Sequence, residues 1–400
     1  MACQPVDVLW IDQKNYHLFQ PLLYQVATGL LDPETIAVPL RFCARKWPNV
    51  RVILNEITDI DLAHRSLTTG TDSFVYDYLV LATGSTTNFF GNSELACHAR
   101  DMKGLTMSLQ LRTEILEAIE RAAMEAPNGQ AAPLEFAVVG GGPTGVELAA
   151  ALSHLLRQQI PKDYPELDMR RTRISLLQSG DALLPALPRA IQAYAEARLK
   201  AQGVTVRLGS RVEHFDGHAM TLANGESFAT SLLIWTAGIH AAPLIEGLPV
   251  TKGPGGRIEV NGNLQIPTYP EVYVLGDLTY CPDRPWPQNA PFARQSGVFA
   301  AQAILHAAGR RRSPPSFHYR DLGTMVALSR MDAIVYLPWL GHFRARGFMG
   351  WLIWLFFHIG SLVGFRNRFA AILDWSSGLI NRRPAAGLII SYAKVPTPKK

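Results

Sequence analysis

The sequence contains few cysteines, and they lie far apart. Its 400 residues include only Cys3, Cys43, Cys97 and Cys281, and no two of them form a C-x-x-C pair. This spacing argues against a disulfide framework, a zinc site built from cysteines and a redox-active dithiol. We therefore predict no metal site, and we expect four single thiols in a reducing compartment.

Acidic residues are scarce at the C-terminal end. From residue 340 onward we count nine Lys or Arg and one acid, Asp374, which gives this end a charge of +8. The remaining 29 basic and 32 acidic residues give −3, so the overall charge of +5 comes from one end of the chain. No nucleic-acid recognition motif accompanies these basic residues, and we expect no nucleic-acid partner.

Strand-like and helix-like segments alternate along the chain, and this alternation predicts an α/β fold with parallel sheets. The apolar fraction of 48% suits a globular protein of this kind. We predict strands within 6–11, 76–84, 173–180, 204–212, 231–238 and 271–280, a helix over 101–125, and a strand–turn–helix unit over 135–156.

The strand–turn–helix unit carries a glycine pattern. Residues 138–147 read VVGGGPTGVE and match G-x-G-x-x-G at Gly140, Gly142 and Gly145. The first glycine of this pattern permits a tight turn, the second lets backbone approach a pyrophosphate, and the third allows close helix–strand packing. Because a strand precedes the turn and a helix follows it, we predict a dinucleotide site, with a structural turn as the alternative.

Three further residues bear on this dinucleotide site. Gln178 and Ser179 end the second strand, where an acid usually binds the ribose hydroxyls of NAD. A neutral Gln does not repel a 2′-phosphate, so we expect weak selectivity for NADH over NADPH; a ribose contact that still favours NADH is the alternative. Glu147 follows the turn, either as a helix N-terminal acid favoured by the dipole or as a group near the reacting rings.

The N-terminal strand raises a separate question. It ends at Asp12, the type of residue that binds a ribose at the end of a second strand in a dinucleotide unit. Such a unit also needs an earlier strand and a glycine-rich turn, and neither stands before residue 6 in this sequence.

Motifs along nearly the whole chain resemble those of type II NADH:quinone oxidoreductases, which are single-subunit flavoproteins that pump no protons. The resemblance rests on NYHLFQPLLYQVATG (15–29), YDYLVLATGS (76–85), GGGPTGVELA (140–149), IWTAGI (234–239), VYVLGDL (272–278), FHYRDLGTM (317–325) and GFRNRF (364–369). The related sulfide:quinone reductases use catalytic cysteines, and here only Cys281 stands near a predicted flavin segment.

The resemblance implies two Rossmann-like dinucleotide-binding domains, an FAD domain with an inserted NAD domain, plus a C-terminal membrane-associating helical region. We expect the FAD domain over 1–105 and 240–311, the NAD(H) domain over 106–239 and the C-terminal region over 312–400. The FAD contacts implied are Asp12, Gln20, Pro21, Ile57, Ala82, Thr83, Gly84, Gly276 and Asp277. The NAD contacts implied are Gly140, Gly142, Thr144, Gly145, Glu147, Gln178, Ala237 and Gly238.

The resemblance also implies a respiratory-chain reaction in two half-reactions, in which NADH reduces FAD and a membrane quinone then takes the electrons. Glu147 and Gln295 are the implied catalytic residues, and Ala293, Gln295 and Ser296 are the implied quinone contacts. Two positions depart from the family pattern A-Q-x-A-x-Q-Q-G, because Pro291 and Ser296 stand where glutamines are expected. These departures leave the quinone preference open.

One apolar segment lies in the basic end. Residues 347–365 contain no Lys, Arg, Asp or Glu and lie between Arg346 and Arg366. A span needs about 20 apolar residues, but this segment holds four glycines and a basic, Trp-bearing sequence follows it. We expect a helix that anchors the protein to an anionic membrane surface, on the cytoplasmic face of a bacterial plasma membrane. A spanning helix, a core helix and a homodimer contact are the alternatives.

Two explanations remain for the absent first strand and glycine turn. In the first, Met1 is an internal methionine of a longer reading frame, and the chain is an active enzyme. In the second, the chain is a truncated, flavin-poor paralogue that binds NAD and a membrane surface without catalysis. We favour the first, because Asp12, Gly84 and Asp277 retain the pattern of flavin contacts.

Overall fold

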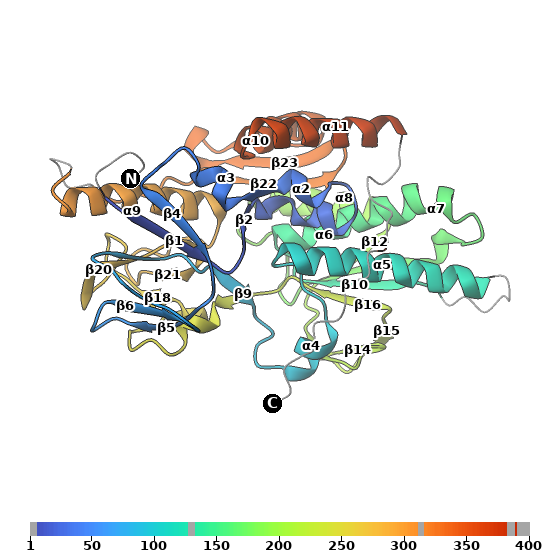
Figure 1. Ribbon diagram of the computed structural model, residues 1–400. Coiled ribbons are helices and arrows are strands. Elements are labelled where there is room, and N and C mark those ends of the chain that lie inside the picture. Colours follow the sequence, from blue (N-terminus) through green and yellow to red (C-terminus); the bar gives the residue numbers. More distant parts are fainter. Residues whose placement is uncertain (1–5, 127–132, 311–315, 382–388, 390–400) are drawn as a thin grey trace. The chain divides into compact units, whose positions relative to one another are not determined.

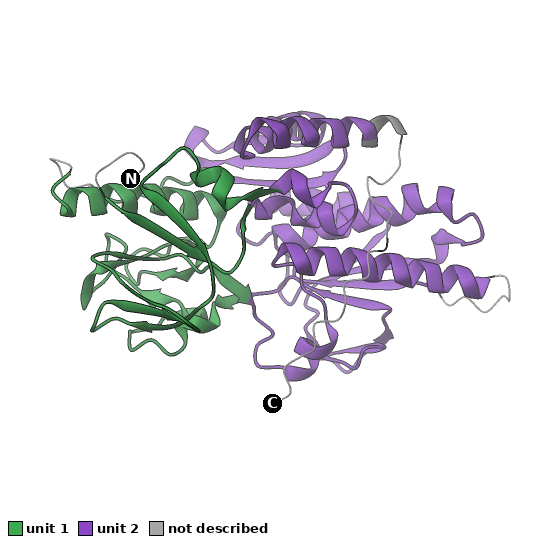
Figure 2. Cartoon of the chain, in the orientation of Figure 1, with its two compact units in different colours: residues 1–17, 37–86, 239–322 green, residues 18–36, 87–238, 323–400 purple. Residues whose placement is uncertain are grey.

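The computed structural model describes residues 6–126, 133–310, 316–381 and 389 (Figure 1). Cys3 and five of the C-terminal basic residues, Arg382, Arg383, Lys394, Lys399 and Lys400, lie outside this part of the chain. The chain divides into two compact units (Figure 2). Unit 1 comprises residues 1–17, 37–86 and 239–322, and unit 2 comprises residues 18–36, 87–238 and 323–400.

Unit 1 contains three pairs of parallel strands, and the shortest of them joins β18 (Ile258–Glu259) to β21 (Thr279–Tyr280). β1 (Val8–Asp12) pairs in parallel with β4 (Val50–Leu54), and β8 (Leu79–Leu81) pairs in parallel with β20 (Tyr269–Val274), which also pairs with β19 (Gln265–Ile266). The other elements of this unit and its borders are β2 (Tyr16–Leu18), β3 (Ala37–Pro39), α3 (Leu40–Ala44), β5 (Ile57–Asp61), β6 (Ser66–Thr69), β7 (Ser73–Val75), β9 (Ser85–Thr87), β17 (Ile239–Ala241), η5 (Pro243–Ile245), η6 (Pro254–Gly256), β18 (Ile258–Glu259), η7 (Gly276–Leu278), β21 (Thr279–Tyr280) and α9 (Ala290–Ala307).

Unit 2 is built around a four-stranded parallel sheet in the order β12-β11-β10-β16. Its strands are β10 (Glu135–Val139), β11 (Arg173–Leu177), β12 (Val204–Arg207) and β16 (Leu232–Trp235), and the last four residues of β10 are buried, as expected of a strand covered on both faces. The chain order reverses between β10 and β16, so this is the place where ligands of open α/β sheets bind.

Unit 2 also contains helices and small strands outside this sheet. The long helix α5 (Leu105–Glu125) and α6 (Pro143–His154) share one hydrophobic core with the sheet. The remaining elements of this part are η1 (Gln20–Leu22), α1 (Leu23–Ala27), α2 (Pro33–Ile36), α4 (Ser93–His98), η3 (Leu155–Gln159), α7 (Ile160–Asp163), η4 (Met169–Arg171), α8 (Arg189–Ala201), β13 (Val212–Phe215), β14 (Ala219–Leu222) and β15 (Ser227–Ala229).

The C-terminal part of unit 2 is a three-stranded antiparallel sheet with two helices. The sheet consists of β22 (Thr324–Ser329), β23 (Asp332–Leu337) and β24 (Phe343–Ala345), with η8 (Pro338–Leu340) between the last two strands. α10 (Gly347–Ser361) packs on β23, and α11 (Phe365–Asn381) packs on α10 and α2. β22 packs on α6, so this sheet lies between the predicted NAD-binding helix and α10.

The predicted 19-residue apolar segment is not one continuous helix. α10 ends at Ser361, and Gly364, with φ +86°, is the last residue of the turn before α11. Within the described ranges, the structure has no helix with both the length and the apolar character needed to cross a bilayer.

A buried carboxylate joins three elements of unit 2. Asp332, which is 4% exposed, opens β23 and accepts hydrogen bonds from the Tyr194 hydroxyl (2.9 Å) and the Arg198 guanidinium (2.5 Å), both on α8. It also accepts the backbone N–H of Gly347 at the first turn of α10 (3.1 Å), where a negative charge complements the helix dipole. This carboxylate therefore holds the start of α10 against the NAD-domain helix α8.

Candidate functional site

The glycine turn lies where the sequence placed it, between β10 and α6. Gly140 has φ +116° and Gly142 is the residue before the first turn of α6. A Cβ on Gly145 would lie 1.9 Å from the carbonyl oxygen of Gly140, so only glycine allows the helix to approach the strand this closely. Thr144, in the first turn, is exposed. The unpaired N–H groups of this first turn face the carboxyl edge of the sheet, which suits a pyrophosphate.

The second wall of this edge comes from the residues that follow β16. The Thr236 hydroxyl donates to the carbonyl oxygen of Val139 (2.8 Å) and thereby ties the end of β16 to the glycine turn. Ala237 and Gly238, predicted NAD contacts, come directly after it. Our sequence reasoning missed Thr236, although a hydroxyl residue beside Ala237 and Gly238 at a strand end was a usable signal.

Gln178 lies at the end of β11 and points at the glycine turn. Its Oε1 accepts the backbone N–H of Gly141 at 2.8 Å. This bond uses the acceptor side of the amide, so its Nε2 is the group left to donate to a ribose hydroxyl or a phosphate. The side chain is therefore a support of the turn as well as a predicted ribose contact.

Glu147 lies one turn into α6 and is buried, with 8% of its surface exposed. Its carboxyl group accepts the backbone N–H of Ala327 in β22 at 3.0 Å. Burial raises the pKa of Glu147 to about 8, and the Ala327 hydrogen bond lowers it only in part, so the group is mostly protonated at neutral pH. The same carboxyl, when charged, adds to the burial that raises the pKa of Tyr24.

In unit 1 two predicted FAD segments lie side by side. β8 ends before residues Ala82–Gly84 and β20 ends before Gly276, and the two strands are parallel neighbours, so both turns are at the same sheet edge. The Ser85 hydroxyl donates to the Asp277 carboxylate at 2.5 Å. Ala82 and Thr83 are exposed, and no described atom lies within 4 Å of a Cβ built on Gly84. These turns thus present open backbone, which fits the pyrophosphate and ribityl parts of FAD.

The other predicted FAD contacts are spread over both units. Asp12 ends β1 and is half-buried, and its Oδ1 accepts the backbone N–H of Lys14 (2.9 Å). Ile57 begins β5 in unit 1. Gln20 and Pro21 form the start of η1 in unit 2, where Gln20 is exposed. Their roles at a flavin stay predictions.

The predicted quinone residues lie on α9 in unit 1 and face different ways. Ser296 is fully buried, and its hydroxyl donates to Ala293 O (2.9 Å) and accepts the N–H of Gly276 (3.3 Å). Gln295 bonds the backbone of Arg320 with both ends of its amide, each at 2.9 Å. Ala293 is exposed and packs near Gly276. Ser296 therefore supports the Gly276 turn, and Gln295 fixes the segment around Arg320.

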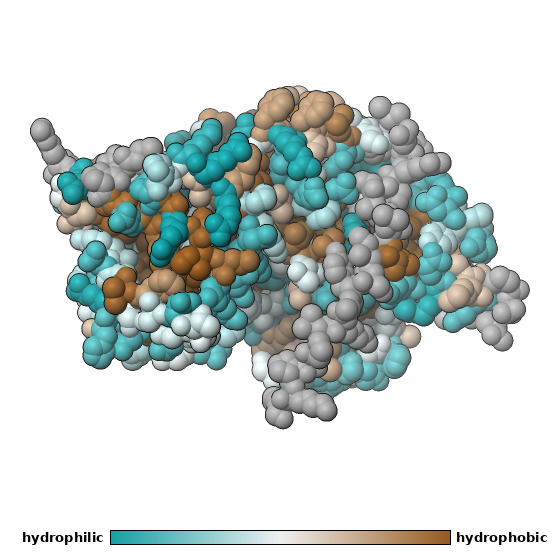
Figure 3. All heavy atoms as spheres, viewed as in Figure 1, coloured by the Kyte–Doolittle hydropathy of each residue, from teal (hydrophilic) through white to brown (hydrophobic). Residues whose placement is uncertain are grey.

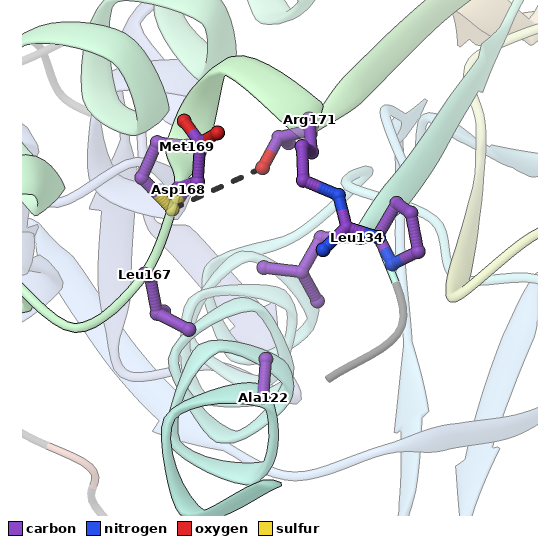
Figure 4. A pocket seen from close by; sticks show the side chains of 8 residues that line it. Ala122, Leu134, Leu167, Asp168, Met169 and Arg171 are labelled. Atoms are coloured by element: carbon purple, nitrogen blue, oxygen red, sulfur yellow. Dashed lines mark hydrogen bonds between the residues drawn. The ribbon is translucent and has the colours of Figure 1, made fainter. Parts of the chain in front are cut away.

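A small pocket of unit 2 lies at the opposite edge of its sheet. It is lined by Ala122 on α5, by Pro133 and Leu134 just before β10, and by Leu167, Asp168, Met169, Arg171 and Thr172 just before β11 (Figure 4). Because β10 and β11 are parallel, this is the amino edge, away from the glycine turn. Its volume of about 40 Å³ is far below the several hundred Å³ of ligand pockets. It has room only for water.

The structure also bears on the metal and thiol predictions. Within the described ranges, no three His, Cys, Asp or Glu side chains gather as metal ligands. Cys43, Cys97 and Cys281 are free thiols, and Cys281 is buried.

Comparisons with known proteins show that the similarity covers most of the chain. Residues 1–297 match the family of pyridine nucleotide-disulphide oxidoreductases. The chain is 34% identical to the type II NADH:quinone oxidoreductase Ndh of Mycobacterium tuberculosis over 94% of this chain and 84% of that protein. It is also 34% identical to NdhA of the same organism, over 94% of this chain and 83% of the relative.

A solved structure shares the fold. The structure of NDH2 from Plasmodium falciparum in complex with NADH matches with a TM-score of 0.85 and 19% identity, covering 95% of this chain and 94% of that one. The α/β fold predicted from the sequence is thereby confirmed. The family match, the identity to the two relatives and the glycine turn at the end of β10 agree with one another. The chain belongs to the type II NADH:quinone oxidoreductase family.

Proposed function

We propose that this protein transfers electrons from NADH to a membrane quinone through FAD, without pumping protons. The observation that carries the proposal is the identity of 34% to a type II NADH:quinone oxidoreductase over 94% of the chain. Bound FAD supplies the redox chemistry, because a flavin accepts a hydride from NADH and releases electrons to a quinone. The residues of the chain bind and orient the reactants.

Unit 2 would bind NADH at the carboxyl edge of its parallel sheet. The first turn of α6 faces the pyrophosphate, and Gln178 donates to the adenosine ribose through its amide nitrogen. Because a neutral Gln does not repel the 2′-phosphate of NADPH, we propose that the protein also accepts NADPH as a substrate. Glu147, buried and protonated near neutral pH, offers an uncharged carboxyl group beside the reacting end.

Unit 1 would bind FAD with the turns that follow β8 and β20. Ala82–Gly84 gives backbone N–H groups, and Asp277, oriented by the Ser85 hydroxyl, accepts a hydrogen bond from the ribityl chain. Ser296 keeps Gly276 in place behind that aspartate. Exposed Ala293 and the Gln295 segment are the proposed quinone contacts of this unit.

The C-terminal helices would attach the protein to a membrane surface. α10 buries Gly350, Trp354 and His358 against the protein, yet its other face is also apolar. Apolar atoms gather over α10 in Figure 3. The exposed apolar side chains of the two helices and η8 are Trp339, Leu340, Phe348, Met349, Phe356, Phe357, Phe365, Phe369, Ile372 and Leu373.

Basic residues flank this apolar surface. Arg344, Arg346 and Arg366 are exposed beside the helices. An apolar face bordered by arginines favours the interface of an anionic bilayer. We therefore propose that the protein attaches peripherally to the cytoplasmic face of a bacterial plasma membrane. A homodimer stays a prediction, which analytical ultracentrifugation would test by measuring the mass of the protein in solution.

The activity is tested by purifying the protein, recording the flavin absorption spectrum and measuring NADH oxidation with ubiquinone and menaquinone analogues. We expect NADH oxidation that requires quinone and releases one NAD⁺ for each quinone reduced. A preparation that holds FAD and binds NADH but reduces no quinone would overturn the proposal.

The attachment is tested by flotation with vesicles that contain or lack anionic lipid. Replacing Phe356 and Phe365, which are 71% and 84% exposed, by serine removes about 2 kcal/mol of lipid burial per ring, so the bound fraction should collapse. Val75→Ser, which alters an equally exposed apolar residue of unit 1, is the matched control. Equal flotation of the two variants would contradict membrane attachment by α10 and α11.

A further inference from the structure

Phe90 is an exposed aromatic residue in an unfavourable backbone conformation. Its φ is +54°, in the left-handed region that bulky residues rarely adopt, and 65% of its surface is exposed. Neither its conformation nor its exposure helps the protein to fold. Such outliers persist where the surrounding structure enforces them, and they concentrate at functional sites.

The surroundings of Phe90 enforce its position firmly. Its backbone N–H donates to the Asn88 side chain (2.7 Å), and the Asn88 N–H donates to the carbonyl of Gly238 (3.3 Å). The buried Trp235 indole donates to the carbonyls of Asn88 (2.9 Å) and Ala237 (2.6 Å). These bonds fasten the segment around Phe90 to the turn that follows β16, and all of these residues belong to unit 2.

The ring of Phe90 lies over Gly238. A Cβ on Gly238 would be 2.7 Å from Cζ of Phe90, and Gly238 itself has φ +80°. The ring also meets the edge of Trp235, with centroids 6.4 Å apart. Glycine at 238 thus leaves room for the phenyl ring, and the rest of the ring faces outward.

The order of the strands in the sheet of unit 2 indicates which part of NADH would lie near Phe90. The dinucleotide crosses the carboxyl edge with its pyrophosphate at the α6 turn. Gln178, the predicted adenosine ribose contact, ends β11 on one side of β10, and Gly238 follows β16 on the other side. The nicotinamide half of a dinucleotide bound in this way would extend toward Gly238, beside which the Phe90 ring lies.

We propose that Phe90 is a substrate-binding residue whose ring packs against the nicotinamide ring of NADH. This inference rests on the proposed function, because it takes NADH as the substrate. Two flat rings gain contact area and an offset aromatic interaction, and the strained, hydrogen-bonded backbone keeps the phenyl ring in place before NADH arrives. The phenyl ring thereby selects the nicotinamide end and leaves the adenosine end untouched.

The test compares NADH with ADP-ribose, which has the same adenosine and pyrophosphate but no nicotinamide ring. Binding of both is titrated by fluorescence to the wild type and to Phe90→Leu, Phe90→Tyr and Phe90→Gly. Phe42→Leu, at another exposed phenylalanine, is the control. We expect Phe90→Leu and Phe90→Gly to raise the Kd of NADH about three- to tenfold with no change for ADP-ribose, and Phe90→Tyr to keep wild-type binding.

A structural role for Phe90 predicts different results. If the ring served only to pack on Trp235 and Gly238, Phe90→Gly would lower Tm and weaken both ligands equally; we expect its Tm to be unchanged or raised, because glycine adopts this φ without strain. Equal weakening of both ligands, or no weakening of NADH, would overturn the inference. A wild type that binds neither ligand would overturn the proposed function instead.

Discussion

Replacing Glu147 by glutamine should change how stability depends on pH. The pKa of this carboxyl group is raised to about 8 in the folded protein, whereas an unfolded chain has an ordinary value near 4.5. The folded state therefore holds a proton that the unfolded state releases between these two values. Stability is full below about pH 4.5 and is lost as pH rises toward 8, at about 1.4 kcal/mol per pH unit.

The size of the effect follows from this slope. Between pH 6 and pH 8 the wild type should lose about 2 kcal/mol more than Glu147→Gln, because glutamine carries no titrating proton. Glutamine also keeps an oxygen that can accept the Ala327 N–H. For a unit of this size, about 2 kcal/mol corresponds to a Tm difference of about 4–8 °C.

The assay is thermal unfolding of both proteins at several pH values in one buffer series. The control is Glu125→Gln at the exposed end of α5, which makes the same change of side chain on the surface and leaves the buried proton of Glu147 in place. The Tm gap between Glu147→Gln and wild type should widen with pH, while the Glu125→Gln gap stays constant. Parallel curves for Glu147→Gln and wild type would refute the reasoning.

Three further predictions concern single contacts. Gly145→Ala should destabilise the protein by several kcal/mol and abolish NADH binding, because its Cβ would lie 1.9 Å from Gly140 O; normal NADH titration would contradict this. Gln178→Glu should raise the NADH-over-NADPH ratio of kcat/KM about tenfold or more, since a carboxylate repels the 2′-phosphate; an unchanged ratio would place the phosphate elsewhere. Asp332→Asn should lower Tm by about 4–8 °C, because Arg198 loses its buried charge partner, whereas Asp283→Asn on the surface should not.

Local patterns in the sequence predicted the glycine turn well. The strand over 135–139 and the helix from Pro143 follow from neighbouring residues, since apolar runs, glycines and a proline at the first helical position act within a few residues. The long helix was predicted over 101–125 and begins at Leu105, after Gly104, an error of the usual size at a helix start. The predicted strand 76–84 is shorter, because only Leu79–Leu81 pairs with β20.

Contacts between distant residues could not be predicted in this way. Glu147 was expected near the reacting rings, and no local signal shows that it bonds Ala327, 180 positions later. The amide of Gln178 also supports the glycine turn in unit 2, and Ser296 faces inward to Gly276 in unit 1; each contact depends on packing within its own unit. The positive φ of Phe90 had only an indirect signal in the Asn and Gly residues around it.

The small antiparallel sheet of β22 and β23 has a mechanical consequence. On one side of this sheet, Ala327 of β22 is hydrogen-bonded to Glu147 of α6. On the other side, α10 packs so closely on β23 that a Cβ built on Gly350 would lie 2.1 Å from the carbonyl oxygen of Ala333. Close packing of this kind resists compression. Under the proposed attachment of α10 to a bilayer, the depth of α10 would therefore also set the height of the glycine turn above the lipid, and NADH would meet the protein at a constant distance from the water–lipid boundary.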